Sequence, residues 1–346
     1  MPSNQDFDAI LARLKETSAP VPMASLYHLS DLGPPEQAAL EQVWAELGTE
    51  RREHIIQNLH EISEANFELS FDSVFRLGLD DESPEVRANS IRALWESEDP
   101  DLMAPLIEFM QHDTDPAVRA AAASALGRYV YLGEMEELPA AQARRVEDAL
   151  LAVINGTDEL GVRRRAVEAV AYSTSRPEIE PLIEAAYQSD ELKLRVSAVF
   201  AMGRAADLHW KRPVMAELKS PEPELRFEAA RAAGELELVE AGPRLAELTA
   251  DADTQVREAA TWSLGQIGGV FARDTLTELL ERAVDEDEQD FIEEALENLS
   301  FTDDVKAFSM FEYDPDQDDL DLDLDDDDVE DDADDVEDEP ADEDIH

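Results

Sequence analysis

The six histidines are the side chains best able to bind a metal or to transfer protons near neutral pH. They are His28, His54, His60, His112, His209 and His346, and they lack the spacing of metal ligands. The chain also contains no cysteine, no glycine-rich phosphate loop and no serine elbow. We therefore expect no catalytic residue, no metal and no cofactor, and a protein that is not an enzyme.

Arginine has the most informative spacing. Arginines recur every 31 to 35 residues, except for one spacing of 44, at Arg52, Arg87, Arg119, Arg163, Arg195, Arg226 and Arg257. We call these the register arginines; Ile292 takes this place in an eighth, degraded copy. Each follows Val or Leu, except Arg52, and precedes small and apolar residues at helical spacing, most clearly in residues 251–268. A second apolar helical segment, often opened by proline, precedes each of them. The repeating unit is therefore a pair of helices.

The shared pattern Asp/Ser-x-x-x-Val/Leu-Arg-x-x-Ala-x-x-Ala-Leu-Gly resembles HEAT repeats. The short spacing with Val-Arg-x-x-Ala resembles their phycobilisome-lyase type, in the armadillo-like helical superfamily, over about residues 35–300. The resemblance implies an all-α, right-handed solenoid of about eight helix pairs, each burying its apolar face against its neighbours. Such folds host many functions, so the resemblance predicts the fold more firmly than the activity.

Helical geometry assigns a role to each position after the register arginine. At 100° per residue, positions −1, +3 and +7 share one face, as in Val256, Ala260 and Leu264, and we predict that they form the core. The arginine points sideways, towards the next pair. We expect a structural ladder between repeats, made by Arg87, Arg119, Arg163, Arg195, Arg226 and Arg257. Its acceptors are carbonyls or the acids Asp81, Asp113, Asp158, Asp190 and Asp251.

Positions +1, +5 and +8 lie opposite the core. In a HEAT-like superhelix the second helices line the concave side, so these side chains should face a groove. Arginines and large aromatic residues gather there in successive units, and such residues are typical anchors of protein interfaces. The predicted partner-binding residues are Arg92, Trp95, Arg164, Phe200, Arg204, Phe227, Arg231 and Trp262. The alternative is that strong curvature or a packed insertion covers them.

The chain divides into three predicted parts. Residues 1–34 form a capping helix, with Phe7, Ile10, Leu11 and Leu14 on one side, and a linker. Residues 35–302 form the solenoid. The long spacing after Arg119 predicts an insertion near residues 129–147, read as a longer loop or as an extended helix. It is either part of a binding face or a tolerated surface insertion.

Residues 303–346 form an acidic tail that we expect to be disordered, because its 24 acidic residues repel one another and apolar residues are few. Asp314, Asp316 and Asp318 begin like a calcium loop, but the turn glycine and closing glutamate are missing. Leu320, Leu322 and Leu324 could add a strand to a partner, or the tail could fold back over the groove arginines. A solvated tail is the simplest interpretation.

Charge and hydropathy limit the partners and the location. The formal net charge is −56, and an acidic body should repel nucleic acid, so we expect no direct nucleic-acid binding. Neither a signal peptide nor an apolar span is evident, so we expect a soluble cytoplasmic protein without membrane contact.

Three functions remain open. The first is a non-enzymatic scaffold or adaptor that binds an unidentified protein partner in the groove. The second is an acidic chaperone that shields a basic protein through the tail. The third, implied only by the resemblance, is an accessory subunit of a bilin or tetrapyrrole lyase.

Overall fold

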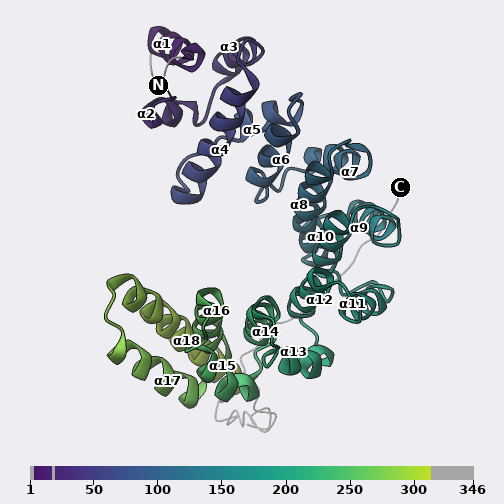
Figure 1. Cartoon of the computed structure of the whole chain (residues 1–346), viewed down its shortest axis with the longest axis vertical. Coiled ribbons are helices and arrows are strands. Elements are labelled where there is room, and N and C mark those ends of the chain that lie inside the picture. Colours follow the sequence, from purple (N-terminus) through teal and green to yellow (C-terminus); the bar gives the residue numbers. More distant parts are fainter. Residues whose placement is uncertain (1–3, 18–19, 313–346) are drawn as a thin grey trace, which may run out of the picture. The chain divides into compact units, whose positions relative to one another are not determined.

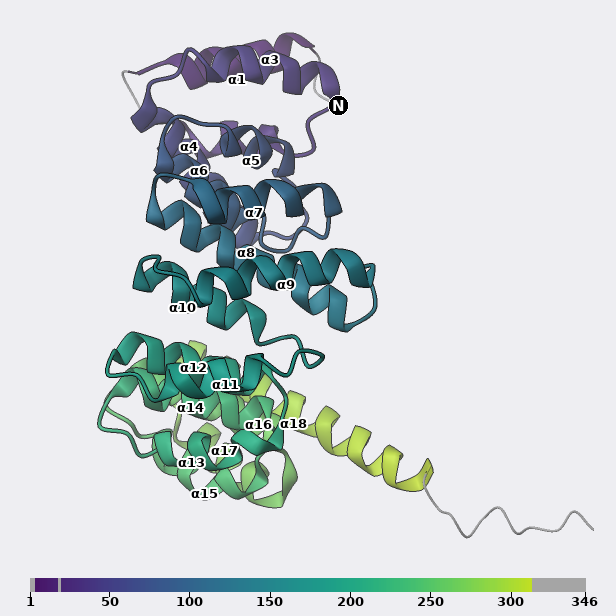
Figure 2. The same ribbon diagram turned by 90° about the vertical axis from the view of Figure 1, so that its right-hand side faces the viewer.

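The computed structural model describes residues 4–17 and 20–312. By compactness the chain divides into two units, residues 1–303 and 304–346. The regular structure in the described residues is entirely helical, and the helices of the first unit stack in chain order (Figures 1 and 2). The predicted tail lies outside the described residues from position 313 onwards. Residues 303–312 continue the last helix, so the helical part extends beyond the boundary predicted at residue 302.

The first helix, α1 (Asn4–Lys15), packs on the start of the stack as predicted for a cap. Its apolar side is buried at Phe7, Ile10, Leu11 and Leu14. Arg51 of α4 donates hydrogen bonds to the backbone oxygens of Leu14, Arg13 and Glu16 just before the linker. Two short helices, α2 (Met23–Leu26) and η1 (Tyr27–Leu29), lead from this cap to the repeats.

Eight helix pairs follow in the described part of the chain, which confirms the predicted all-α solenoid. They are α3 (Pro34–Trp44) with α4 (Thr49–Ala65), α5 (Asp72–Leu79) with α6 (Pro84–Ala93), α7 (Met103–His112) with α8 (Pro116–Glu134), α9 (Ala140–Ile154) with α10 (Leu160–Val170), α11 (Ile179–Tyr187) with α12 (Leu192–Arg204), α13 (Lys211–Glu217) with α14 (Pro223–Glu235), α15 (Gly242–Leu248) with α16 (Thr254–Ile267), and α17 (Gly269–Arg282) with α18 (Glu286–Glu312). Short 3₁₀ turns, η2 (Pro100–Leu102), η3 (Leu208–Trp210) and η4 (Val239–Ala241), lead into α7, α13 and α15.

Local sequence explains where the second helices begin and end. Asp115 and Asp253 accept hydrogen bonds from backbone N–H groups of the first turns of α8 and α16. Proline fills the first helical position of α6, α8 and α14, where its missing N–H is no loss. Gly268 ends α16 at a φ of 67°, a conformation that glycine adopts without strain.

The two helices of each pair form separate layers. In Figure 1, α7, α9, α11 and α13 lie on the outer side of the stack, and α8, α10 and α12 lie on its inner side. The core lies between these layers. The side chains predicted at positions −1, +3 and +7 are buried, except for Leu194, which is half-buried. The register arginine therefore predicted the core correctly.

Position +8 differs from its prediction. It was assigned to the groove, but it is buried at Gly127, Ala171, Gly203, Gly234 and Gly265. A Cβ atom on Gly127 would lie 3.2 Å from the Cα atom of Ala169, and one on Gly265 would lie 2.7 Å from the backbone oxygen of Ala295. Successive second helices approach so closely here that only very small residues fit, and this contact takes position +8 off the surface in these five repeats. Trp95, at position +8 after Arg87, remains exposed as predicted.

The insertion after Arg119 is an extension of helices. It lengthens α8 to 19 residues and α9 to 15. Tyr129, Val130 and Leu132 of the extension are buried, and the Tyr129 hydroxyl donates a 2.8 Å hydrogen bond to the backbone oxygen of Asp99. The extended-helix interpretation is therefore the correct one.

Candidate interaction surface

Register arginines join neighbouring helix pairs through two hydrogen bonds to one carboxylate. The distances are 2.9 and 2.8 Å for Arg87 with Asp113, 3.0 and 2.7 Å for Arg119 with Asp158, and 2.8 and 2.8 Å for Arg226 with Asp251. Arg52 makes the same contact with Asp81, at 2.6 and 3.0 Å. Because both partners are largely buried, each pair fixes the angle between adjacent repeats.

The ladder also holds its carboxylates in the charged form. Burial raises the pKa of Asp113, but hydrogen bonds from Arg87 and from the Asp115 backbone lower it more, so the pKa lies below its ordinary value. Asp81 and Asp158 follow the same balance. At Asp251 the hydrogen bond from Arg226 is the largest cause of the lowered pKa. These aspartates stabilise the fold above their ordinary pKa, and the contribution is lost as the pH falls through the lowered values.

Three of the expected ladder arginines bond only within their own repeat, among the residues that the structure describes. Arg163 donates to the Ile154 oxygen at 3.2 Å, and Arg195 to the Ser189 oxygen at 3.5 Å. Arg257 donates to the oxygens of Asp251 and Ala252, at 2.9 and 3.3 Å, and to the Thr254 hydroxyl at 2.9 Å.

A serine in place of the aspartate explains why Arg163 and Arg195 have no carboxylate partner among the described residues of the next repeat. The Ser189 hydroxyl accepts the Glu191 N–H at 3.1 Å, in the position where Asp251 accepts the Asp253 N–H at 3.0 Å. Ser220 takes the same place before Glu222. The expectation of Asp190 in the ladder was wrong by one residue, since Asp190 is exposed and Ser189 fills the position. A serine has no carboxylate to offer the arginine of the preceding repeat.

The inner helices carry an alternating row of arginines and aromatic rings, which we call the Arg–aromatic stack. It consists of Arg128, Tyr131, Tyr172, Phe200, Arg204, Phe227 and Arg231, from α8, the end of α10, α12 and α14. The guanidinium carbons lie 5.1 to 6.0 Å from the ring centroids, and the Tyr131 and Tyr172 rings meet edge to face at 5.9 Å. These distances are typical of cation–π and aromatic contacts.

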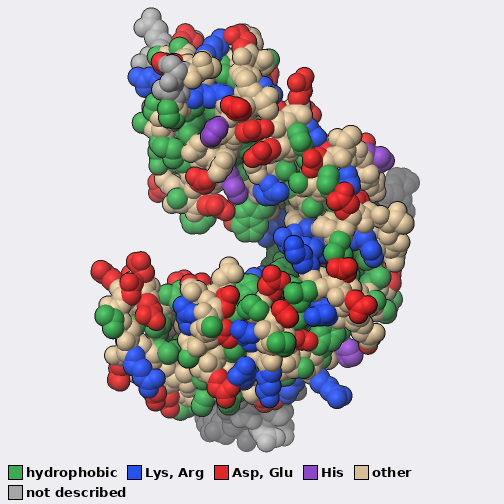
Figure 3. Space-filling model, in the orientation of Figure 1, with side chains coloured by type: hydrophobic (Ala, Val, Ile, Leu, Met, Phe, Trp, Pro, Cys, Tyr) green, Lys and Arg blue, Asp and Glu red, His purple; other side chains and the backbone are tan. Residues whose placement is uncertain are grey.

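Glutamates hold the arginines of this surface in place. Glu235 lies 3.2 Å from Arg204 and 3.6 Å from Arg231. Glu168 lies 3.4 Å from Arg164 and 2.5 Å from Arg165. The surface is therefore ordered by contacts of its own. Figure 3 shows Lys and Arg side chains gathered on the hollowed side of this face, near α10.

Some polar atoms of this surface are buried without a hydrogen-bond partner among the described residues. They are the Nε atoms of Arg128 and Arg204 and the Oε2 atom of Glu228. Burial is the main reason why the pKa of Glu228 is raised to about 7. The carboxylates of Glu168 and Glu235 raise this pKa further, whereas Arg231 and Arg204 lower it. Burial likewise raises the pKa of Glu235. Buried polar groups without a hydrogen-bond partner are costly, so these atoms lower the stability of the folded protein.

The predicted binding residues separate into two places. Arg164, Phe200, Arg204, Phe227 and Arg231 come together on α10, α12 and α14, where the two phenylalanines are half-buried. Trp262 is half-buried in α16, and its ring reaches Gly234 of α14.

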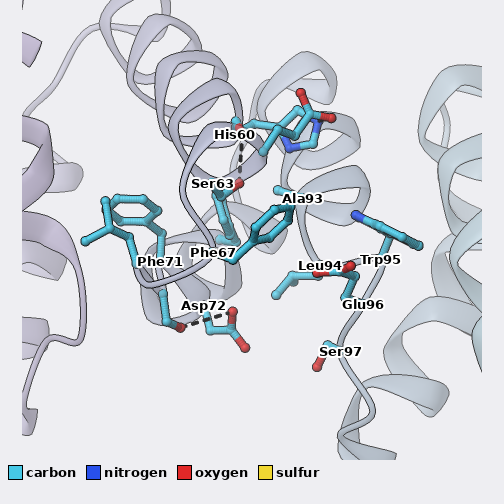
Figure 4. A pocket seen from close by; sticks show the side chains of 14 residues that line it. His60, Ser63, Phe67, Phe71, Asp72, Ala93, Leu94, Trp95, Glu96 and Ser97 are labelled. Carbon is cyan, nitrogen blue, oxygen red and sulfur yellow. Dashed lines mark hydrogen bonds and ion pairs between the residues drawn. The ribbon is translucent and has the colours of Figure 1, made fainter. Parts of the chain in front are cut away.

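Arg92 and Trp95 lie apart from this group. Arg92 is exposed and donates to Asn89 at 2.5 Å. Trp95 follows the end of α6 and lines an open cavity of about 500 Å³, with Phe67 across from it (Figure 4).

Sequence reasoning missed Arg128, Tyr131, Tyr172 and Glu228. Arg128 and Tyr172 both stand nine residues after a register arginine, as do Arg204 and Glu235. Position +9 thus forms a row along the inner helices, and this spacing was a signal in the sequence. Positions +1, +5 and +9 after the register arginines of α8 to α16 form what we call the second-helix face. Tyr131 and Glu228 stand outside this spacing.

None of the described helices is both long and apolar enough to span a membrane. No three His, Asp or Glu side chains gather as metal ligands in residues 4–17 and 20–312.

Comparison with known proteins places the fold. The family model of HEAT repeats matches residues 73–148 and 212–300. No curated protein sequence matches the chain. Among solved structures, the chain is similar to YibA of Escherichia coli, with 18% identity over 70% of this chain and 96% of that one and a TM-score of 0.40.

Two further structures show comparable similarity. The complex of CpcE and CpcF of phycocyanin lyase from Nostoc has 17% identity over 66% of this chain and 94% of that chain, with a TM-score of 0.42. Human deoxyhypusine hydroxylase has 18% identity over 86% and 96%, with a TM-score of 0.34. Identities this low concern the fold alone. From the matched repeats and the eight stacked helix pairs, this chain is a HEAT-repeat protein.

Proposed function

We propose that this protein is a non-enzymatic adaptor that binds a protein partner on its second-helix face, with the Arg–aromatic stack as the anchor. The observation that carries the proposal is the stack itself: seven arginine and aromatic side chains in one contiguous row across four consecutive repeats. HEAT repeats generally mediate protein binding, which agrees with this role.

The composition of the stack suits a binding anchor. Arginine and aromatic residues contribute most of the binding free energy in protein interfaces, where they fill pockets near the centre. Their contacts with one another and with Glu235 already restrict their rotamers. These side chains therefore lose little conformational entropy when a partner binds, which favours affinity.

The test is quantitative affinity capture with full-length protein, comparing the wild type with Phe227→Ala and Arg231→Lys. Arg231→Lys keeps the charge but loses the planar group that stacks on Phe200 and Phe227. We expect a partner captured by the wild type to fall at least about tenfold in both variants. The matched control is Phe301→Ala, which removes an exposed aromatic residue outside the stack.

Circular dichroism on each variant establishes that it is folded before capture. If folded Phe227→Ala and Arg231→Lys retain every partner at the wild-type level, the stack is not the anchor and the proposal is wrong. Equal loss in Phe301→Ala would also contradict it, since binding would then not depend on this face.

A further inference from the structure

The cavity beside Trp95 has aromatic walls that are open to solvent. It lies where the ends of α4 and α6 meet the loop before α5 and measures about 500 Å³. Phe67 is 84% exposed and Trp95 56% exposed, which is unusual for rings of this size. Figure 4 shows Phe67 and Trp95 on either side of the space. Two exposed rings across a cavity suggest that something binds between them.

The charged side chains of the lining are acidic. Glu64, Asp72 and Glu96 contribute carboxylates to the cavity, and no lysine or arginine belongs to its described lining. His60 is the one other titratable side chain there, with its Nε2 atom 3.6 Å from Glu64. The charge of the cavity is therefore complementary to a cation and unsuited to an anion.

Helix ends add to this potential. The cavity lining includes His60, Ser63 and Glu64 from the last turns of α4, and Ala93 and Leu94 from the end of α6. The carboxyl end of a helix carries partial negative charge on its unpaired carbonyl groups, and two such ends border the same cavity. Rings, carboxylates and helix ends all favour a positive charge here.

We propose that this cavity binds a lysine or arginine side chain of a basic protein segment, held between the faces of Phe67 and Trp95. The aromatic faces attract the cation, and the carboxylates compensate for the water that it loses. The aliphatic stem of the side chain packs along the same two rings, which are the exposed apolar surfaces of the cavity. The site lies on α4 and α6 and shares no residue with the Arg–aromatic stack, so it does not depend on the proposed adaptor function.

The test uses the full-length protein and three short acetylated, amidated peptides, Gly-Gly-X-Gly-Gly with X as lysine, arginine or norleucine. Proton NMR follows the ε-methylene resonance of the lysine peptide, which a stacked ring should shift upfield. We expect lysine and arginine to bind and norleucine, which lacks the charge, not to bind. Trp95→Ala and Phe67→Ala should each weaken lysine binding about three- to tenfold.

These substitutions separate the site from diffuse attraction to an acidic protein. Neither changes the charge, so non-specific attraction predicts equal binding by the wild type and both variants. Both side chains are exposed, so their removal should leave the fold intact. Trp95→Phe retains a ring and should retain most of the affinity, and Phe301→Ala is the control for loss of an exposed ring elsewhere.

Two results would overturn the proposal. If norleucine binds as tightly as lysine, the cavity is simply apolar. If Trp95→Ala and Phe67→Ala bind the lysine peptide like the wild type, the rings do not form the site. Neither result bears on the Arg–aromatic stack, whose test uses different residues and a different ligand.

Discussion

Glu228, beside Phe227 in α14, shows how a single residue reflects its surroundings. Its Oε2 atom has no hydrogen-bond partner, and burial among other carboxylates raises its pKa to about 7. In the unfolded chain the same carboxyl group ionises near the ordinary glutamate pKa of 4.5. The folded protein therefore binds this proton more tightly than the unfolded chain, and stability must fall as the pH rises from about 4.5 through 7.

Glu228→Gln should remove this pH dependence. At pH 4 the side chain is neutral in both states, so the variant should match the wild type. At pH 8.5 the variant should be more stable by about 1–2 kcal/mol, because a charge is no longer buried without a partner. Urea unfolding at the two pH values measures the difference.

Glu224→Gln, an exposed position on the same helix, is the matched control and should change stability little at either pH. If the stability difference between Glu228→Gln and the wild type is the same at pH 4 as at pH 8.5, Glu228 is not buried as a charge.

At the scale of the element, two features determine how the second helices pack. Small residues at position +8 allow adjacent second helices to touch, as at Gly265 and Ala295. Arg–Asp pairs then fix neighbouring repeats to each other, except where Ser189 and Ser220 replace aspartate. The junctions that follow Arg163 and Arg195 are instead held by apolar packing and by other carboxylates. Glu168 accepts a hydrogen bond from Ser197 across the first junction, and Glu235 pairs with Arg204 across the second.

Gly265→Ala should destabilise the protein although alanine favours helices. The added Cβ atom would lie 2.7 Å from the backbone oxygen of Ala295, so α18 must move away, and we expect a loss of about 1–3 kcal/mol. Gly161→Ala in α10 is the matched control, since nothing lies within 4 Å of its Cβ. It should be neutral or stabilising by up to about 1 kcal/mol. Chemical denaturation measures the free energy of unfolding of both variants. If Gly265→Ala were as stable as Gly161→Ala, this account of the packing would be wrong.

Ser189→Asp should complete the ladder at the junction after Arg163. The new carboxylate could accept the Glu191 N–H, as Asp251 accepts that of Asp253, and present itself to Arg163. We expect a gain of about 1 kcal/mol in the unfolding free energy. Adding Arg163→Lys to Ser189→Asp should abolish the gain, because lysine cannot form two parallel bonds. An equal gain with lysine would show that the aspartate acts only on the helix start.

At the scale of the whole molecule, charge is the dominant property. A net charge of −56 on 346 residues means that acidic side chains repel one another over much of the chain. The seven register arginines and the three arginines of the Arg–aromatic stack make up ten of the 28 lysines and arginines. Self-repulsion therefore opposes the folded state, and the ladder acts against it locally.

Salt should raise the thermal stability. Between about 0.1 M and 1 M salt the screening length shortens from about 10 Å to 3 Å, which removes distant repulsion and leaves the buried pairs nearly unchanged. We expect the midpoint of unfolding by circular dichroism to rise steadily with sodium chloride, and equally with choline chloride. A falling midpoint would mean that ion pairs outweigh repulsion, and a rise with sodium alone would indicate specific cation binding.

Local pattern accounts for what could be predicted. The Val-Arg pair, the small residues after it and the cap residues before it place the helices and the core, because each depends only on neighbours along the chain. For the same reason, Phe200, Arg204 and Phe227 could be identified as candidates. Phe67 could not, because it lies in a loop whose position depends on how α4 and α6 pack.

The sequence by itself determined the repeating helix pairs, the buried positions −1, +3 and +7 and the acidic charge, since spacing and composition suffice for these. Only the tertiary structure decided which outward positions remain exposed. The angle and close approach between successive second helices bury position +8 after the register arginines of α8 to α16. They also bring Arg204 over Tyr172 and Arg231 over Phe200, and leave Trp95 of the α6 repeat facing Phe67. Those contacts join residues about 30 positions apart, and helical periodicity contains no information on the geometry between helices.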